Sequence, residues 1–178
     1  CTLGTILDIT EQKSAQAYNE DISKIVEESL NEIFIVAADT LNFIQVNQGG
    51  RQNLGYTPDE LREITPIVIK PEFTNKKFVK TIQPLLDGTK EKLIFYTIHE
   101  RKDKTTYSVE IHLQYASLGG QAVFVAFVSD ITEQRESELA IQKEKETAQM
   151  YLDIAGSIVV VIDKDEQISL LNQRGEEI

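Results

Sequence analysis

The spacing of apolar residues near the start of the chain indicates a helix. Within residues 14–30 they recur every three or four positions, at Ala15, Tyr18, Ile22, Ile25, Val26 and Leu30. This spacing gathers them in one narrow stripe, which is typical of a two-stranded coiled coil. We therefore expect residues 14–30 to form a linker and an N-terminal helix with this kind of stripe. Pairing with a second copy is expected through the charged helix that follows residue 133, where the seam would consist of Ile141, Ala148, Leu152 and Ala155.

Short apolar runs and helix-start signals alternate in the next part of the chain. Residues 33–37 and 43–46 are predicted strands on either side of a turn-like segment. Asn47 is expected to begin a short helical stretch. Thr57, with Pro58 after it and Glu60 three residues later, predicts a second helix start. Thr74 is expected to cap a further helix that closes near residue 88, and Pro84 should bend or end it.

Three longer β segments follow, over residues 93–102, 106–116 and 122–129. The middle segment alternates well, with Tyr107, Val109, Ile111, Leu113 and Tyr115 on its apolar face. Short turns join the three, so they are expected to be antiparallel. The element order predicts an α+β fold: a five-stranded antiparallel sheet with short helices on one face, flanked by N- and C-terminal helices.

The sequence also repeats itself. Asp-Ile-Thr-Glu-Gln begins at Asp8 and again at Asp130, and a second pair of matches relates residues 33–47 to residues 158–172. We expect a tandem array: residues 1–13 end an upstream repeat, 31–134 form a complete one, 135–150 an exit helix, and 151–178 begin a downstream repeat. The alternative is that the two Asp-Ile-Thr-Glu segments are merely similar strand-to-helix caps. Because the chain starts without Met, we expect it to be a piece of a longer protein.

Composition excludes several classes of partner. The 178 residues carry 29 Asp and Glu against 18 Lys and Arg, a net charge of −11, which disfavours nucleic acids and anionic membrane surfaces. One Cys and two His cannot supply a four-ligand Cys/His zinc site, so no metal is expected. No apolar run approaches the ~18 residues needed to insert in a membrane. We expect a cytoplasmic fragment, which leaves a membrane-associated parent protein open.

Four short motifs resemble those of PAS domains. They are the Val-Asn pair at 46–47, the Asn-Leu-Gly-Tyr-Thr-Pro-Asp-Glu-Leu stretch at 53–61, the Arg-Lys-Asp turn at 101–103 and the closing Asp-Ile-Thr-Glu at 130–133. Their order and spacing are more specific than any one of them. The family usually has Gly where Lys104 stands, so this turn is expected to be longer or less regular.

The resemblance implies a sensory or relay module without catalysis of its own. The parent is expected to be a sensor histidine kinase. The alternatives are a diguanylate cyclase or a non-sensing dimerisation spacer. Expected partners are a second copy, neighbouring PAS repeats and a downstream output domain. An enzyme would need Glu110 and His112 to converge with another carboxylate in a pocket, yet alternation places both on the polar face of their strand.

Residues that cofactor-binding members require are absent. No His lies between residues 47 and 98, where the axial ligand of haem would stand, and the Cys of covalent flavin binding is missing. Val109 and Val128 occupy the positions of the amides that would hold a flavin ring, although non-covalent FAD is less firmly excluded. The expected ligand is therefore none, or an unknown small apolar molecule.

The resemblance also assigns candidate site residues. The candidate ligand pocket consists of Phe78, Phe95, Val109, Ile111, Leu113, Ala126 and Val128. The alternative is that these seven residues simply pack the core. The signal-output motif consists of Asp130, Ile131, Thr132 and Glu133. His112 is expected at the surface, whereas His99 is either a satisfied structural histidine or a pH-sensitive switch.

Overall fold

The computed structural model of this chain describes residues 10–154, 160–165 and 167–171. These fall into two compact units that divide between Ile131 and Thr132, and each unit is described by itself. The first copy of the repeated motif starts at Asp8, and the second repeat match ends at Asn172. Both positions lie outside the described residues, as does Ala155 of the expected dimer seam.

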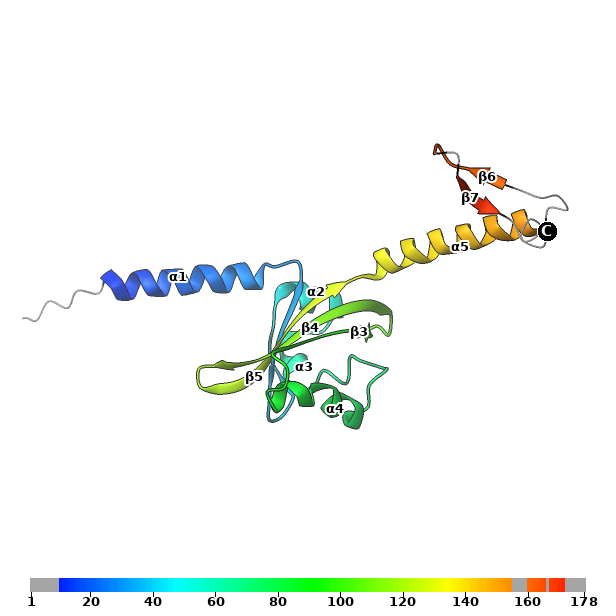
Figure 1. The fold of residues 1–178 in the computed structure, drawn as a ribbon. Coiled ribbons are helices and arrows are strands. Elements are labelled where there is room, and N and C mark those ends of the chain that lie inside the picture. The colour runs from blue at the N-terminus through cyan, green and yellow to red at the C-terminus, as the bar shows by residue number, and fades with distance from the viewer. Residues whose placement is uncertain (1–9, 155–159, 166, 172–178) are drawn as a thin grey trace, which may run out of the picture. The chain divides into compact units, whose positions relative to one another are not determined.

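The first unit contains one helix, then two strands, three short helices and three longer strands (Figure 1). The elements are α1 (Thr10–Glu27), β1 (Glu32–Ala37), β2 (Phe43–Val46), α2 (Gln48–Leu54), α3 (Pro58–Arg62), α4 (Asn75–Leu86), β3 (Lys92–Glu100), β4 (Thr106–Leu118) and β5 (Gln121–Asp130). The strands form one sheet in the order β2-β1-β5-β4-β3, with every neighbouring pair antiparallel. The predicted α+β fold with a five-stranded antiparallel sheet is confirmed.

Side-chain caps start the short helices where the sequence predicts them. The Asn47 side chain caps α2, and Thr57 with Glu60 forms a reciprocal capping box at the start of α3. Thr74 caps α4, which runs through Pro84 and ends two residues later at Leu86. Pro84 therefore sits in the last turn, where its missing N–H removes one helical hydrogen bond, and the helix ends two residues later as predicted.

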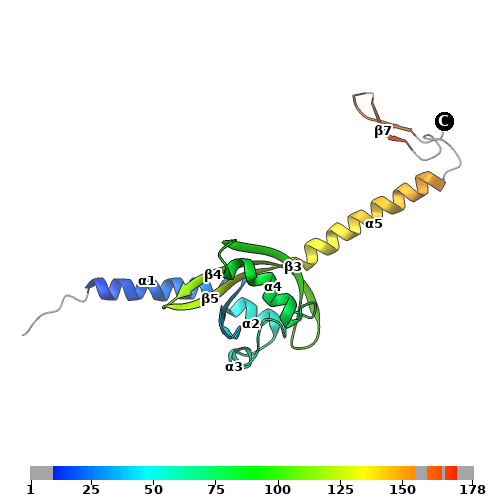
Figure 2. The ribbon, with the colours of Figure 1, turned by 60° about the horizontal axis from the view of Figure 1, so that its bottom comes forward.

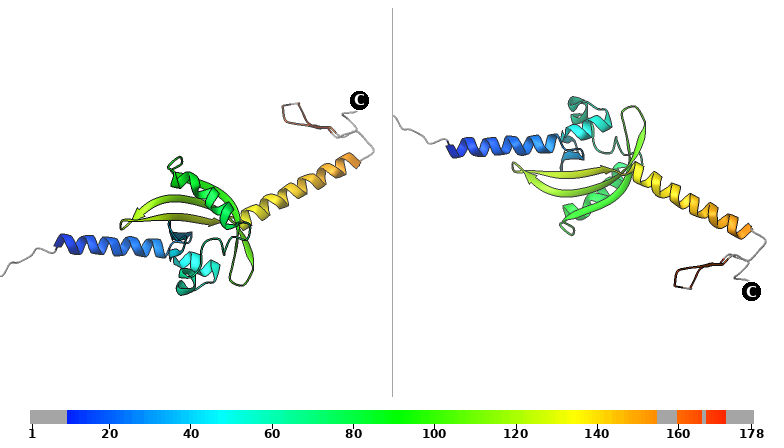
Figure 3. Two further views of the ribbon diagram at one scale, coloured as in Figure 1. Left: turned by 90° about the horizontal axis from the view of Figure 1, so that it is seen from below. Right: turned by 90° about the horizontal axis from the view of Figure 1, so that it is seen from above.

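The core lies between one face of the sheet and the helices α2, α3 and α4 (Figure 2). Leu54 from α2, Leu61 from α3 and Ile82 from α4 are each at most 2% exposed. They pack in one cluster with buried residues of β1, β4 and β5. The long hairpin of β4 and β5 can be followed from two opposite directions in Figure 3. Alternation on β4 holds from Tyr107 to Leu113, but Tyr115 is 45% exposed, contrary to the sequence prediction.

The turn between β3 and β4 differs from the sequence prediction. It is compact: Arg101 N–H donates to Thr105 O (2.8 Å), and Lys104 N–H donates to Arg101 O (3.0 Å). The Asp103 carboxylate also accepts from Thr105 N–H (2.9 Å). Lys104 adopts φ 73°, a left-handed conformation that glycine reaches much more easily than lysine. The chain therefore keeps a regular turn and accepts the steric cost of a Cβ at this position.

The second unit contains α5 (Thr132–Ile154) and a hairpin of β6 (Val160–Ile162) and β7 (Ile168–Leu171). The hairpin is antiparallel, and its register shifts after two pairs, as it does between β1 and β2. α5 is longer than the exit helix expected over residues 135–150. α1 begins at Thr10, inside the segment assigned to an upstream repeat, and ends at Glu27 before residue 30.

Candidate functional site

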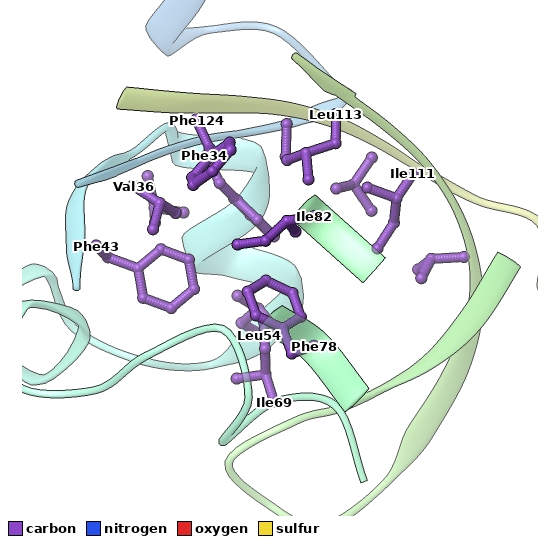
Figure 4. Packing of buried hydrophobic residues seen from close by; sticks show 14 of the residues in the cluster. Phe34, Val36, Phe43, Leu54, Ile69, Phe78, Ile82, Ile111, Leu113 and Phe124 are labelled. Atoms are coloured by element: carbon purple, nitrogen blue, oxygen red, sulfur yellow. The ribbon is translucent and has the colours of Figure 1, made fainter. Parts of the chain in front are cut away.

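A small cavity lies between the sheet and the helices. Its volume is about 20 Å³, which holds about one water molecule. Figure 4 shows Phe78 and Ile82 of α4 between their helix and the part of β4 that carries Ile111 and Leu113. The cavity is lined by Phe34, Val36, Pro66, Lys70, Phe78, Phe95, Ile111, Leu113, Phe124, Ala126 and Val128.

Six of the seven residues predicted to form a pocket line this cavity. The exception is Val109, which is fully buried in the core cluster but does not reach the cavity wall. Four further residues complete the apolar wall and were not predicted: Pro66 and the strand residues Phe34, Val36 and Phe124. The three strand residues could have been found by alternation on β1 and β5, because each shares the inner face with predicted residues across the sheet.

Lys70 is the charged residue of the cavity wall, and no pattern in the sequence predicts it there. It lies in the segment between α3 and α4, where Lys70 N–H donates to Ile67 O (3.1 Å). The carbonyl before it, on Ile69, accepts from Glu100 N–H at the end of β3 (2.9 Å). Lys70 is 4% exposed, and burial lowers the pKa of its ammonium group to about 7, although the charge of Glu32 opposes this shift.

A buried carboxyl group lies at the start of β1. Glu32 is 3% exposed, and its oxygens accept from Asn53 Nδ2 (2.6 Å) and from the Tyr107 hydroxyl (3.1 Å). Burial raises the pKa of Glu32 to about 7, with a smaller contribution from the charge of Asp130, while the two hydrogen bonds and Lys70 oppose the rise. Burial and the charge of Glu32 likewise raise the pKa of Tyr107. This group of residues, Glu32, Asn53, Tyr107, His99 and Lys70, is called the buried polar cluster below.

His99 is the fully buried member of this cluster, with 0% exposure. Its ring stacks on Phe34, a cavity-wall residue, at 6.0 Å between centroids. Because the Tyr107 hydroxyl donates to Glu32, it accepts from His99 Nδ1 (3.3 Å), which leaves the proton on Nδ1. Burial, together with the charge of Lys70, holds the pKa of His99 well below its usual value, so its 3.9 Å approach to Glu32 is not an ion pair.

This environment decides between the two interpretations of His99. A histidine whose pKa lies well below its usual value stays neutral near pH 7 and is no switch there, so the structural interpretation is favoured. Within the described residues, however, Nε2 of His99 has no hydrogen-bond partner, so the side chain is only half satisfied. His112 lies at the surface as predicted, with its side chain 43% exposed and Nε2 2.6 Å from Glu110.

Arg101 connects the buried polar cluster to the end of β5. Its Nε donates to Asn53 O (2.9 Å) and its Nη2 to Asn53 Oδ1 (2.8 Å). The guanidinium group also lies over the Tyr107 ring, 4.1 Å from its centroid. Nη2 is 3.8 Å from the Asp130 carboxylate, the first residue of the predicted output motif. Contacts therefore run without a break from Glu32 to the point where the chain leaves the sheet.

The remaining output-motif residues follow Asp130 directly. Ile131 N–H donates to Ser108 O of β4 (2.9 Å), which holds the end of β5 against its neighbour. Thr132 is the first residue of α5, and Glu133 lies in its first turn, where a negative charge is favourable. Among the described residues, no group of three or more His, Cys, Asp or Glu side chains is placed to hold a metal ion. In the same part of the chain, no helix is long and apolar enough to cross a membrane.

Comparisons with known proteins agree with this architecture. The PAS domain of an HTR-like protein from Haloarcula marismortui is 27% identical, with a TM-score of 0.60, and the match covers 70% of this chain and 100% of that one. A PAS domain from a two-component sensor histidine kinase is 14% identical, with a TM-score of 0.54 and coverage of 65% and 98%. A domain of a sensory box sensor histidine kinase/response regulator from Geobacter sulfurreducens is 17% identical, with a TM-score of 0.53 and coverage of 63% and 95%.

Comparison of the sequence with known families points to the same kind of domain as these similar folds. No curated protein sequence matches this chain. A family model described as a PAS domain, however, matches residues 31–133, which is more than half of the chain and nearly the range that the repeat boundaries predict. Because both the sequence model and the fold agree, the chain belongs to the PAS domain family.

Proposed function

We propose that this PAS domain works in a multidomain sensor histidine kinase, where it passes ligand- or conformation-dependent signals through a dimeric helix. The observation that carries the proposal is a run of contacts that starts at Phe34 in the cavity wall. It passes through His99, Tyr107, Glu32, Asn53 and Arg101 and ends at Asp130. It gives a change at the cavity a physical route to the residue that precedes α5. Two of the similar folds, named as parts of sensor histidine kinases, support the choice of parent.

The helix that enters the domain supports pairing with a second copy. Tyr18, Ile22 and Ile25 of α1 are 66%, 42% and 67% exposed, and their spacing keeps them on one side of the helix. The last turn of α1 is fixed to the domain, because Glu27 forms an ion pair with Arg51 of α2. A change in how two α1 helices pack would therefore be felt at the start of α2.

A matched pair of variants tests the dimer. Ile22→Asp places a charge in the proposed seam, and Ser23→Asp places the same charge one residue along, outside the stripe. Size-exclusion chromatography with light scattering should show a dimer for the native chain and for Ser23→Asp, and a monomer for Ile22→Asp. A native chain that stays monomeric at high concentration would refute pairing through this fragment.

The cavity volume favours a second candidate, a conformational relay or spacer that binds nothing. A cavity of about 20 Å³ leaves no room for a metabolite unless side chains move. Native mass spectrometry of the purified fragment separates the two functions, since it reports oligomeric state and co-purified small molecules together. A dimer with an added small mass supports sensing. A dimer with nothing bound supports the relay, and the same two outcomes apply if the parent is a diguanylate cyclase.

A further inference from the structure

The side chains of Glu32, Tyr107 and His99 form a chain of hydrogen bonds inside the domain. Glu32 Oε2 is 3.1 Å from the Tyr107 hydroxyl, and that hydroxyl is 3.3 Å from His99 Nδ1. All three residues are buried, and Tyr107 lies directly opposite His99 on the neighbouring strands β4 and β3. The hydroxyl has a single proton, so it donates to one of its two neighbours and accepts from the other.

The protonation state of Glu32 decides the direction of these bonds. An ionised carboxylate only accepts, so Tyr107 donates to Glu32 and accepts from His99 Nδ1–H. A protonated Glu32 donates from Oε2 to the Tyr107 oxygen, because its other oxygen, Oε1, already accepts from Asn53 (2.6 Å). The Tyr107 hydroxyl then donates to His99 Nδ1, and a nitrogen that accepts this bond no longer carries a proton.

His99 can follow this reversal because no second bond holds its tautomer. The nitrogen that carries the proton of a neutral imidazole is set by the bond that the other nitrogen makes. Within the part of the chain that the structure describes, Nε2 of His99 is buried without a hydrogen-bond partner, so the bond at Nδ1 alone decides. Burial, together with the charge of Lys70, holds the pKa of His99 well below its usual value, so the ring is neutral in both arrangements.

We propose that His99 is a tautomeric switch: when Glu32 takes up a proton, the His99 proton moves from Nδ1 to Nε2 and both hydrogen bonds of Tyr107 reverse. In balance, one proton from solvent is added at Nε2, the Nδ1 proton passes to the Tyr107 oxygen, and the Tyr107 proton passes to Glu32 Oε2. The cluster therefore gains one proton and loses one negative charge, while His99 stays neutral. The inference concerns the domain by itself and depends on neither the proposed dimer nor the parent kinase.

The charged groups around Glu32 set the pH of the change. Burial and the charge of Asp130 on β5 favour the protonated form, Lys70 favours the ionised form, and the pKa of Glu32 is about 7. Burial and the charge of Glu32 raise the pKa of Tyr107, although the Arg101 guanidinium group over its ring opposes this. Tyr107 therefore keeps a proton to pass on, and the switch operates near neutral pH.

NMR of the chain labelled with ¹⁵N-histidine reads the tautomer, because protonated and unprotonated ring nitrogens resonate far apart. The chain has two histidines, and His112→Gln identifies the signals of His99 by removing the others. We expect the His99 proton on Nδ1 at pH 8.5 and on Nε2 at pH 5.5. The midpoint should lie near pH 7 and match the titration of the Glu32 ¹³Cδ signal in the same chain.

Two matched variants separate the buried carboxyl group from a surface one. In Glu32→Gln the new NH₂ group donates to the Tyr107 oxygen and the new C=O accepts from Asn53, as in the protonated acid, so His99 should carry its proton on Nε2 at both pH values. Glu110→Gln makes the same change beside the exposed His112, on the polar face of β4, and should leave the switch unchanged. Tyr107→Phe removes the connecting hydroxyl and should make the His99 tautomer independent of pH.

Three results would overturn the inference. They are a His99 proton that remains on Nδ1 at pH 5.5 while Glu32 titrates, a Glu32 that keeps one protonation state from pH 5.5 to 8.5, and a His99 ring that becomes positively charged in this range. If a variant fails to fold, the parallel titration of the Glu32 and His99 signals in the native chain still decides. The dimer is measured separately by light scattering, so its failure leaves this result unaffected.

Discussion

Removing the Asn47 side chain should destabilise the domain more than any ordinary surface change. Asn47 is 1% exposed, and its Oδ1 accepts from Ile33 N–H (2.8 Å) and Gly50 N–H (3.1 Å). Its Nδ2 lies within hydrogen-bond distance of the carbonyl oxygens of Val26, Ser29 and Asn31, at 3.2, 3.1 and 2.9 Å. One amide thus connects α1, the link that follows it, β1 and α2.

The magnitude follows from these contacts. The amide has two N–H groups for three carbonyls, so it forms four good hydrogen bonds at most. Each is worth about 1 kcal/mol net, and a buried group left without a partner costs about 1–3 kcal/mol. Asn47→Ala should therefore lower the free energy of unfolding by about 3–5 kcal/mol. That is a large share of the ~5–15 kcal/mol that holds an ordinary domain together.

The Asn47→Asp variant tests the accepting oxygen of the side-chain amide apart from its donating NH₂ group. It keeps an acceptor for Ile33 and Gly50 and adds a charge that is favourable at the start of α2. The second oxygen, however, faces three carbonyls without a proton to share. We expect a loss of about 2–4 kcal/mol, with hydrogen-exchange protection falling over residues 26–31 and persisting in β1.

Urea unfolding followed by circular dichroism measures these effects, because the chain has no Trp. Gln48→Ala is the matched control, since its exposed side chain lies next in the chain and should change stability by less than ~0.5 kcal/mol. Losses below ~1 kcal/mol for both Asn47 variants would show that water replaces the amide at no great cost. The reasoning from buried hydrogen bonds would then be wrong.

Two further predictions concern a buried acid and a strained turn. The folded-state pKa of Glu32 is about 7 against an ordinary value of 4.5, so the folded protein binds more protons between these values and loses stability as pH rises through them. Glu32→Gln should remove this decline, worth up to ~3 kcal/mol, in unfolding curves recorded from pH 4.5 to 7.5; an unchanged pH profile would contradict it. Because Lys104 has φ 73°, the Lys104→Gly variant should have a free energy of unfolding about 1 kcal/mol higher than the Lys104→Ala variant. Both variants lose the lysine side chain, but only alanine keeps a Cβ in the strained conformation, and thermal or urea unfolding measures the difference. Equal stability of the two variants would refute the strain argument.

The fold could be predicted from sequence because its signals are local. Alternation identifies the buried face of β4, and the capping residues Asn47, Thr57 and Thr74 mark three helix starts. Six of the seven predicted pocket residues line the cavity for the same reason: they share one face of the sheet. Val109 is on that face too, but whether a buried residue touches a cavity depends on how α4 packs, which no single strand encodes.

The buried charges could not be predicted in this way. Lys70 lies in a segment without helix or strand periodicity, and Glu32 precedes an apolar run, where a charged residue is normally solvated. Their burial depends on partners distant in sequence: Asn53 and Tyr107 for Glu32, and the cavity wall for Lys70. Lys104 was misjudged for a related reason, because the hydrogen bonds of the whole turn hold a conformation that lysine alone disfavours.

The buried side chains of Glu32 and Lys70 suggest how the proposed signal could be carried, because the charge of each affects the protonation of the other. The charge of Lys70 favours the ionised form of Glu32, whereas burial and the charge of Asp130 favour the protonated form. Loss of the proton from Lys70 would remove the first influence, so Glu32 would take up a proton and its bonds to Asn53 and Tyr107 would rearrange. Asn53 also holds Arg101, which lies beside Asp130, so this change would reach the end of β5. Coupling of this kind is reciprocal: whatever moves Asp130 or changes its charge must in turn alter the proton affinity of Glu32.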